Sequence, residues 1–138
     1  MSALKNISFK ICGMRDHSNI MDVANLSPQY MGFIFYDKSP RFVGKDFSLP
    51  SSLSSSIKRV AVFVNESSKV IVQRANLGFD FVQLHGNETA EQCAILRDSG
   101  LKVIKAFSID EDFDFQDVAP YKRYVKFFLF DTKGKFFG

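Results

Sequence analysis

The fold is indicated most clearly by residues 59–86, which read RVAVFVNESSKVIVQRANLGFDFVQLHG. This stretch begins with a β-branched apolar run, Arg59–Val64, and ends with a second apolar run, Phe81–Leu84. Between them, Ser67 or Ser68 can cap a helix whose apolar residues recur with helical spacing, and a glycine can end that helix. A strand, a helix and a second strand joined in this order are typical of a parallel sheet.

The same pattern continues in both directions along the chain. The runs that predict strands are Ser8–Ile11, Tyr30–Phe35, Arg59–Val64, Phe81–Leu84, Lys102–Phe107 and Phe127–Phe130, and the spacing between their centres leaves room for one helix per unit. Further helices are predicted after a cap at Asp16 or Ser18, and after Thr89, which fits a capping box with Gln92. The serine-rich stretch Ser48–Ser56 is weakly periodic and predicts only a short or irregular helix.

Alternation within the strands separates an apolar face from a mixed face, because successive side chains point to opposite sides of a sheet. The apolar face is predicted to hold Ile11, Val60, Val62, Val64, Val82, Leu84, Ile104 and Ala106. The mixed face collects Lys10, Cys12, Asn65, Gln83, His85, Lys105 and Asp131. Helices cover both faces of an open flavodoxin-like sheet, which should then be apolar on both sides, whereas a barrel has an inner lumen. The pattern therefore favours a parallel (β/α) barrel of the TIM type.

Four polar residues follow the strands at the end where barrel enzymes place their reactive groups: Cys12, Asn65, His85 and Asp131. A complete barrel of eight units needs roughly 200 residues or more. The chain has 138 residues and six predicted strands. We therefore expect one domain, residues 1–138, that forms an incomplete barrel of about six of the eight strands and ends before strands seven and eight.

Composition narrows the class of protein further. The chain is 46% apolar and 24% charged, which is typical of a globular domain. A net charge of +3 suits an anionic small molecule and is too small for a nucleic-acid-binding surface. Apolar runs such as Phe127–Phe130 are far shorter than the roughly 20 residues that cross a membrane. Cys12 and Cys93 have neither metal-site nor disulfide spacing, so we expect no metal and a cytoplasmic location.

Five motifs, in order and at the ends of the predicted strands, give the chain a family resemblance. They are Lys10–Gly13 (KICG), Gly32–Phe35 (GFIF) continuing to Lys38–Arg41 (KSPR), Val62–Asn65 (VFVN), Val82–Gly86 (VQLHG) and Phe130–Gly134 (FDTKG). In these motifs the chain resembles the phosphoribosylanthranilate isomerases, which are barrel enzymes of tryptophan biosynthesis. The resemblance covers nearly the whole chain.

The resemblance implies an Amadori rearrangement of N-(5'-phosphoribosyl)anthranilate to 1-(2-carboxyphenylamino)-1-deoxyribulose 5-phosphate, without a metal or redox cofactor. It implies that Cys12 is the general base and Asp131 the general acid. Arg41 would bind the anthranilate carboxylate, for which a planar guanidinium is well suited. His85 and Asn65 would bind or position the phosphorylated aminosugar substrate.

This chemistry makes demands on both reactive groups. A free thiol has a pKa near ~8.5, so Cys12 needs a nearby cation such as Lys10 to favour the thiolate. A carboxyl group has a pKa near ~3.9, so Asp131 needs desolvation to hold a proton at neutral pH. Without the resemblance, Cys12 is typical of an inert buried thiol and Asp131 of a turn or helix cap.

Two further expectations concern the missing strands. In the resembling family the phosphate site is built from the loops after strands seven and eight. The alternative function is therefore a catalytically silent barrel fragment or a phosphosugar-binding pseudo-enzyme. Open barrel edges also favour a homo-oligomer, because unpaired strands bind further strands.

Overall fold

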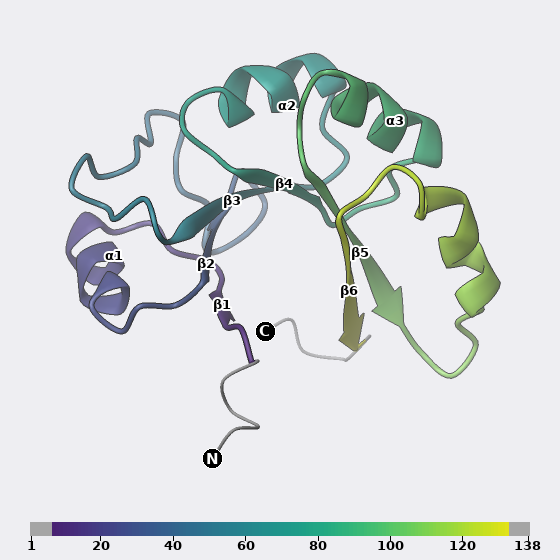
Figure 1. Cartoon of the computed structure of the whole chain (residues 1–138), viewed down its shortest axis with the longest axis horizontal. Coiled ribbons are helices and arrows are strands. Elements are labelled where there is room, and N and C mark those ends of the chain that lie inside the picture. Colours follow the sequence, from purple (N-terminus) through teal and green to yellow (C-terminus); the bar gives the residue numbers. More distant parts are fainter. Residues whose placement is uncertain (1–6, 133–138) are drawn as a thin grey trace.

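The computed structural model describes residues 7–132 as a single curled sheet with helices on its outer side (Figure 1). The strands are β1 (Lys10–Ile11), β2 (Tyr30–Ile34), β3 (Lys58–Phe63), β4 (Phe81–Leu84), β5 (Val103–Ile109) and β6 (Phe127–Thr132). The helices are α1 (His17–Ala24), α2 (Ser68–Ala75), α3 (Ala90–Asp98) and the 3-10 helix η2 (Phe115–Tyr121).

All six predicted strands are confirmed, and every pair of neighbours is parallel in the order β1-β2-β3-β4-β5-β6. Each strand therefore lies beside the strand that precedes it in the sequence. This topology and the curl of the sheet confirm the predicted parallel (β/α) barrel type. Within the described residues, the sheet is open between β1 and β6.

The helix caps agree with the sequence in two places and differ in a third. Asp16 accepts the backbone N–H of Asn19 at 3.1 Å, and Ser67 caps α2. Thr89 caps α3 by accepting the N–H of Gln92 at 3.2 Å, but the predicted capping box is wrong. The Gln92 side chain donates instead to the carbonyl of Glu66 at 2.8 Å and so ties α3 to the loop before α2.

The stretch between β2 and β3 contains turns and no helix, so the short or irregular helix predicted at Ser48–Ser56 is wrong. Its apolar residues still contribute to the core, since Leu53 and Ile57 are buried with residues of α1 and β2. Within residues 7–132, no helix combines the length and the apolar character needed to cross a membrane.

The predicted division of the faces is wrong for β3 and β5. Gln83 pairs with Val62 on one side and Ile104 on the other, and paired residues of parallel strands share a face. Val60, Val62, Ile104 and Ala106 therefore lie on the inner face, and Lys105, paired with Leu84, lies on the outer face. The reason is that β3 is buried on both sides, so every position from Val60 to Phe63 is apolar and alternation carries no signal.

The inner face is consequently apolar along its middle and polar only near the ends of the strands. Its buried apolar residues are Ile34, Val60, Val62, Phe81 and Ile104. The outer face packs Ala61, Phe63, Val82, Leu84 and Val103 against α2 and α3. Burial on both faces holds β3 and β4 as the rigid centre of the sheet, and this centre positions the polar residues that follow them.

Candidate active site

Cys12 and Asp131 come from opposite ends of the sheet and lie on the same face of it. Cys12 directly follows β1, and its side chain packs against the inner apolar cluster. Leu129 of β6 packs against the same cluster, and Asp131, two residues further along that strand, shares its face. The thiol and the carboxylate predicted from the sequence therefore both lie on the inner face of the sheet.

Two glycines make room for the Cys12 thiol and for Arg41. A Cβ atom at Gly32 of β2 would lie 2.8 Å from the Cys12 Sγ, so only glycine leaves the half-buried thiol in place. Gly13 has a φ of +82°, and a Cβ there would lie 2.6 Å from the Arg41 Nη1. Arg41 in turn donates to the backbone carbonyl of Cys12 at 3.3 Å. The structure thus brings Arg41 beside Cys12.

His85 and Asp131 form the second pair of the site. The His85 Nε2 lies 3.5 Å from the Asp131 Oδ2, and its Nδ1 lies 3.2 Å from the Nε2 of Gln83. Gln83 is 1% exposed. The Asp131 side chain is 57% exposed, so the desolvated surroundings expected of this group are not provided by the residues described.

Asn65 holds a loop. It has a φ of 51°, and its backbone N–H donates to the Glu88 Oε2 at 2.8 Å. Its side-chain oxygen accepts the N–H of Asn87 at 2.7 Å. A Cβ at Gly86 would collide with that same oxygen, which explains the glycine of the VQLHG motif. The structure thus gives Asn65 a role in shaping the segment after β4, and its predicted contact with substrate stays a prediction.

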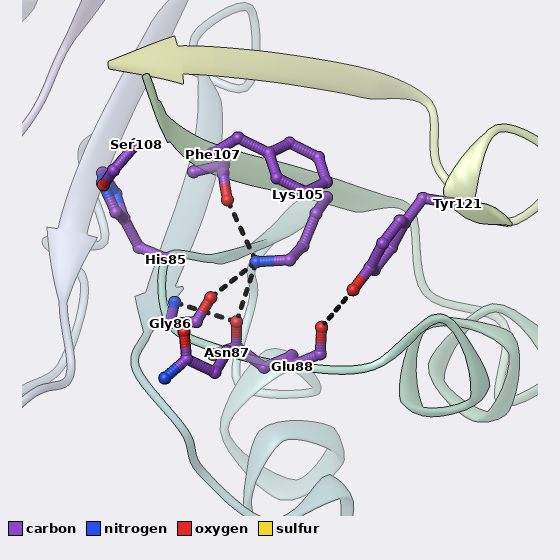
Figure 2. A pocket seen from close by; sticks show the side chains of 9 residues that line it. His85, Gly86, Asn87, Glu88, Lys105, Phe107, Ser108 and Tyr121 are labelled. Carbon is purple, nitrogen blue, oxygen red and sulfur yellow. Dashed lines mark hydrogen bonds and ion pairs between the residues drawn. The ribbon is translucent and has the colours of Figure 1, made fainter. Parts of the chain in front are cut away.

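A buried ion pair that sequence reasoning missed lies beneath this segment. The Lys105 Nζ lies 3.1 Å from the Glu88 Oε1, with side-chain exposures of 2% and 0%. Lys105 also donates to the carbonyl of Gly86 at 2.8 Å, and Glu88 accepts the Gly86 N–H at 2.8 Å. Tyr121 of η2 donates to the Glu88 carbonyl at 2.8 Å (Figure 2). A lysine inside an apolar strand was the available signal, but no pattern identified Glu88 as its partner.

A pocket of about 370 Å³ opens over this ion pair, between the ends of β4 and β5 (Figure 2). It is lined by His85, Gly86, Asn87, Glu88, Lys105, Ala106, Phe107, Ser108 and Tyr121. A second pocket of about 520 Å³ borders Asp131 and the end of β5. Among the described residues, no group of three or more His, Cys, Asp or Glu side chains could hold a metal ion.

The two cysteines have different surroundings. Cys93 is fully buried among the residues that pack α3 on the sheet. Burial raises the pKa of the Cys93 thiol to about 11. Burial also raises the pKa of Tyr121, and the nearby Cys93 and Glu88 add to that shift. Cys12 is half-buried and borders the inner face, so it is the thiol that a small molecule can reach.

A family model and the sequences of curated proteins both match most of this chain. Residues 9–137 match the family model described as N-(5'phosphoribosyl)anthranilate (PRA) isomerase. An N-(5'-phosphoribosyl)anthranilate isomerase of Phocaeicola vulgatus is 44% identical over 124 residues, which is 89% of this chain and 59% of the relative. The corresponding protein of Parabacteroides distasonis is 41% identical over 133 residues, which is 94% of this chain and 60% of the relative. The chain thus spans about three fifths of the length of these curated relatives.

Solved structures agree with the sequence matches. The phosphoribosyl anthranilate isomerase of Thermotoga maritima superposes with a TM-score of 0.77 at 29% identity, covering 95% of this chain and 64% of that one. A phosphoribosyl anthranilate isomerase in complex with reduced 1-(o-carboxyphenylamino)-1-deoxyribulose 5-phosphate gives a TM-score of 0.75 at 29% identity, covering 92% and 66%. The motifs quoted above lie within residues 9–137, although Lys133 and Gly134 fall outside the described residues. The chain therefore belongs to the N-(5'-phosphoribosyl)anthranilate isomerase family.

Proposed function

We propose that residues 1–138 act as one barrel-type domain that converts N-(5'-phosphoribosyl)anthranilate to 1-(2-carboxyphenylamino)-1-deoxyribulose 5-phosphate in tryptophan biosynthesis. The observation that carries this proposal is that Cys12 and Asp131 lie on one face of the sheet. The chain belongs to a family of N-(5'-phosphoribosyl)anthranilate isomerases, which supports the same reaction. The reaction needs one acid and one base that reach the same sugar from different sides. Two strands at opposite ends of a curled sheet can supply such a pair.

Asp131 acts first in the proposed mechanism, as the general acid. Its proton goes to the ring oxygen of the ribose while the bond between that oxygen and C1' breaks. The nitrogen of the anthranilate group supplies the electron pair that forms the C1'=N iminium, and the former ring oxygen becomes the C4' hydroxyl. Each atom is retained, as an isomerisation requires.

Cys12 acts second, as the general base. Its sulfur takes the proton from C2', and the electron pair of the broken C–H bond forms the C1'=C2' bond and neutralises the iminium nitrogen. The resulting enolamine becomes the ketone when the C2' hydroxyl loses its proton and C1' gains one. Arg41, held beside Cys12, is positioned to bind the anthranilate carboxylate through its guanidinium.

The remaining parts of the proposal follow from this chemistry. The substrate is a phosphorylated aminosugar, and proton transfer alone completes the reaction, so no cofactor is required. The two cysteines are both free thiols, which supports a reducing cytoplasmic location.

The test is direct turnover of N-(5'-phosphoribosyl)anthranilate by the purified chain, followed as the loss of its fluorescence. We expect Cys12→Ser and Asp131→Asn each to lower kcat by about 100-fold or more, the contribution of a positioned acid or base. Cys93→Ser is the matched control, because it changes a buried thiol that packs α3 on the outer face of the sheet, and it should leave kcat unchanged. Turnover that survives both active-site substitutions would exclude this mechanism.

A second candidate function is binding without turnover. The observation that favours it is the exposure of the Asp131 side chain, which leaves the proposed acid in contact with water. Titration calorimetry with the reduced product that a structural relative binds separates the two functions. Binding of that compound by a chain with no detectable turnover would establish the second function in place of the first.

A further inference from the structure

Gln83, His85 and Asp131 form a series of three side chains on the inner face. Gln83 lies in β4, and His85 directly follows that strand. Because the two are two residues apart, their side chains share a face. The Gln83 Nε2 lies 3.2 Å from the His85 Nδ1, and the His85 Nε2 lies 3.5 Å from the Asp131 Oδ2. Within the described residues the Gln83 Oε1 is buried and lacks a hydrogen-bond partner.

The Gln83 amide could be placed in two ways, and each implies a different form of His85. If the amide nitrogen faces the ring, it donates to Nδ1, and the ring proton lies on Nε2. If the amide oxygen faces the ring, Nδ1 must carry the proton, and a neutral ring then turns a lone pair toward the Asp131 carboxylate. Either placement leaves one buried amide atom without a protein partner, so the contact with Asp131 decides between them.

Electrostatics favours the first placement. A lone pair on Nε2 facing an anionic oxygen 3.5 Å away is repulsive, whereas an N–H at that position is attractive. For a neutral ring, only the first placement satisfies both sides at once.

The surroundings explain why Gln83 can impose this choice on His85. Gln83 is 1% exposed and pairs with Val62 and Ile104, both of them buried, so its amide is shielded from bulk water. The segment after His85 is fixed by the hydrogen bond from Lys105 to the Gly86 carbonyl. Asp131, by contrast, is mostly exposed and lies on the outermost described strand. His85 thus lies between a buried amide and a fixed backbone segment, and the more exposed Asp131 is the partner that it can position.

We propose that Gln83 fixes His85 as the neutral Nε2–H tautomer, and that this N–H positions the Asp131 carboxyl group for proton transfer. The part concerning Asp131 rests on the proposed function, whereas the tautomer of His85 does not. His85 and Gln83 are positioning residues in this proposal. His85 acts through Asp131, and Gln83 acts through His85.

The tautomer can be read directly by long-range ¹H–¹⁵N correlation spectra of the ¹⁵N-labelled chain at pH 8. The chain contains two histidines, so His17 serves as the internal reference. We expect the His85 signals of a neutral ring with the proton on Nε2. A proton on Nδ1, or a doubly protonated ring, would overturn the proposal from the wild-type spectrum alone, even if no variant folds.

Gln83→Glu tests the role of the amide. A carboxylate can only accept, so the variant should place a proton on the Nδ1 of the His85 ring. We expect kcat to fall about tenfold with KM within about twofold, as for an outer partner that orients a functional group. Gln73→Glu, the same change at an exposed position of α2, is the matched control and should alter neither the spectrum nor kcat. An unchanged His85 spectrum in Gln83→Glu would contradict the proposal.

Asp131→Asn tests the second contact. Removing the carboxylate should shift the His85 Nε2–H resonance and leave the His17 signals in place. An unmoved His85 resonance would refute the contact. The two proposals fail separately: a chain without turnover that keeps the Nε2–H tautomer counts against the proposed function, whereas an active chain with the other tautomer counts against this inference.

Discussion

At the scale of single residues, Gly32 controls where the Cys12 thiol lies. Gly32→Ala places a methyl group 2.8 Å from the Sγ of Cys12, so the thiol must move. We expect a loss of about 1–3 kcal/mol in the free energy of unfolding, the usual cost of overpacking. The proposed turnover should fall by up to about 100-fold, because small displacements of a reacting group are costly. Urea denaturation and the fluorescence assay measure the two effects.

The control for this prediction is the same change in a Cys12→Ala background. That background lacks the sulfur atom that the new methyl group meets, so the loss of stability should shrink. An equal loss in both backgrounds would mean that the strain arises elsewhere on β2.

Cys93 gives a pH dependence with a definite direction. Its pKa is raised from 9.0 to about 11, so the folded chain retains a proton that the unfolded chain releases. The free energy of unfolding should therefore keep the full contribution of this thiol below pH 9 and should lose about 3 kcal/mol of it between pH 9 and 11. The raised pKa of Tyr121 acts in the same direction.

The measurement is chemical denaturation of wild type and Cys93→Ala at several pH values. The difference in stability between the two should narrow as the pH rises toward 11, whereas Cys12→Ala should keep the full alkaline loss. A constant difference would show that the Cys93 thiol does not titrate as described.

At the scale of elements, the buried pair of Lys105 and Glu88 joins β5 to the segment after β4. Glu88→Gln leaves the lysine without its anionic partner, so we expect a loss of about 3–5 kcal/mol, typical of a broken buried pair. Adding Lys105→Met should recover part of this loss, since the unpaired charge is then removed. The exposed pair Arg97–Asp98 is the matched control, and Asp98→Asn should cost less than about 1 kcal/mol.

Thermal and chemical denaturation of the single and double variants measure the coupling between the two side chains. Losses that simply add in the double variant would show that the pair is not coupled.

Much of the architecture could be predicted from sequence because it depends on local patterns. The strands follow from short apolar runs, and caps such as Asp16 and Thr89 from single side chains. The faces of β3 could not be predicted, because burial on both sides removes the alternation on which the prediction depends. Cys12 and Asp131 became candidates through motifs at strand ends, and their roles stay predictions. The contacts of Gln83 and Glu88 depend on register and loop geometry that no sequence pattern specifies.

At the scale of the whole molecule, the described sheet ends in two unpaired edges, β1 and β6. Apolar side chains lie at these edges, including Ile11 and Phe127, which are 39% and 48% exposed. We expect the chain to associate with further copies of itself through these strands. Sedimentation velocity over a range of concentrations should show species larger than the monomer.

Ile11→Lys places a charge on the edge and should shift the population toward monomer, because an edge lysine opposes strand pairing. Ile95→Lys, at an exposed position of α3, is the control and should leave the association unchanged. A wild-type chain that stays monomeric at high concentration would contradict the expectation.

The order of the strands in the sheet also bears on how the molecule is made. Each strand pairs with the one synthesised just before it, so a nascent polypeptide leaving the ribosome always finds its docking partner already in place. Folding of the described strands can then proceed one strand at a time from β1 to β6, because each of these pairings joins strands that are consecutive in the sequence. The strand that has formed last always has one unpaired edge, to which the next strand adds. A pause in translation would leave this edge exposed, so that a strand of a neighbouring nascent chain could pair with it.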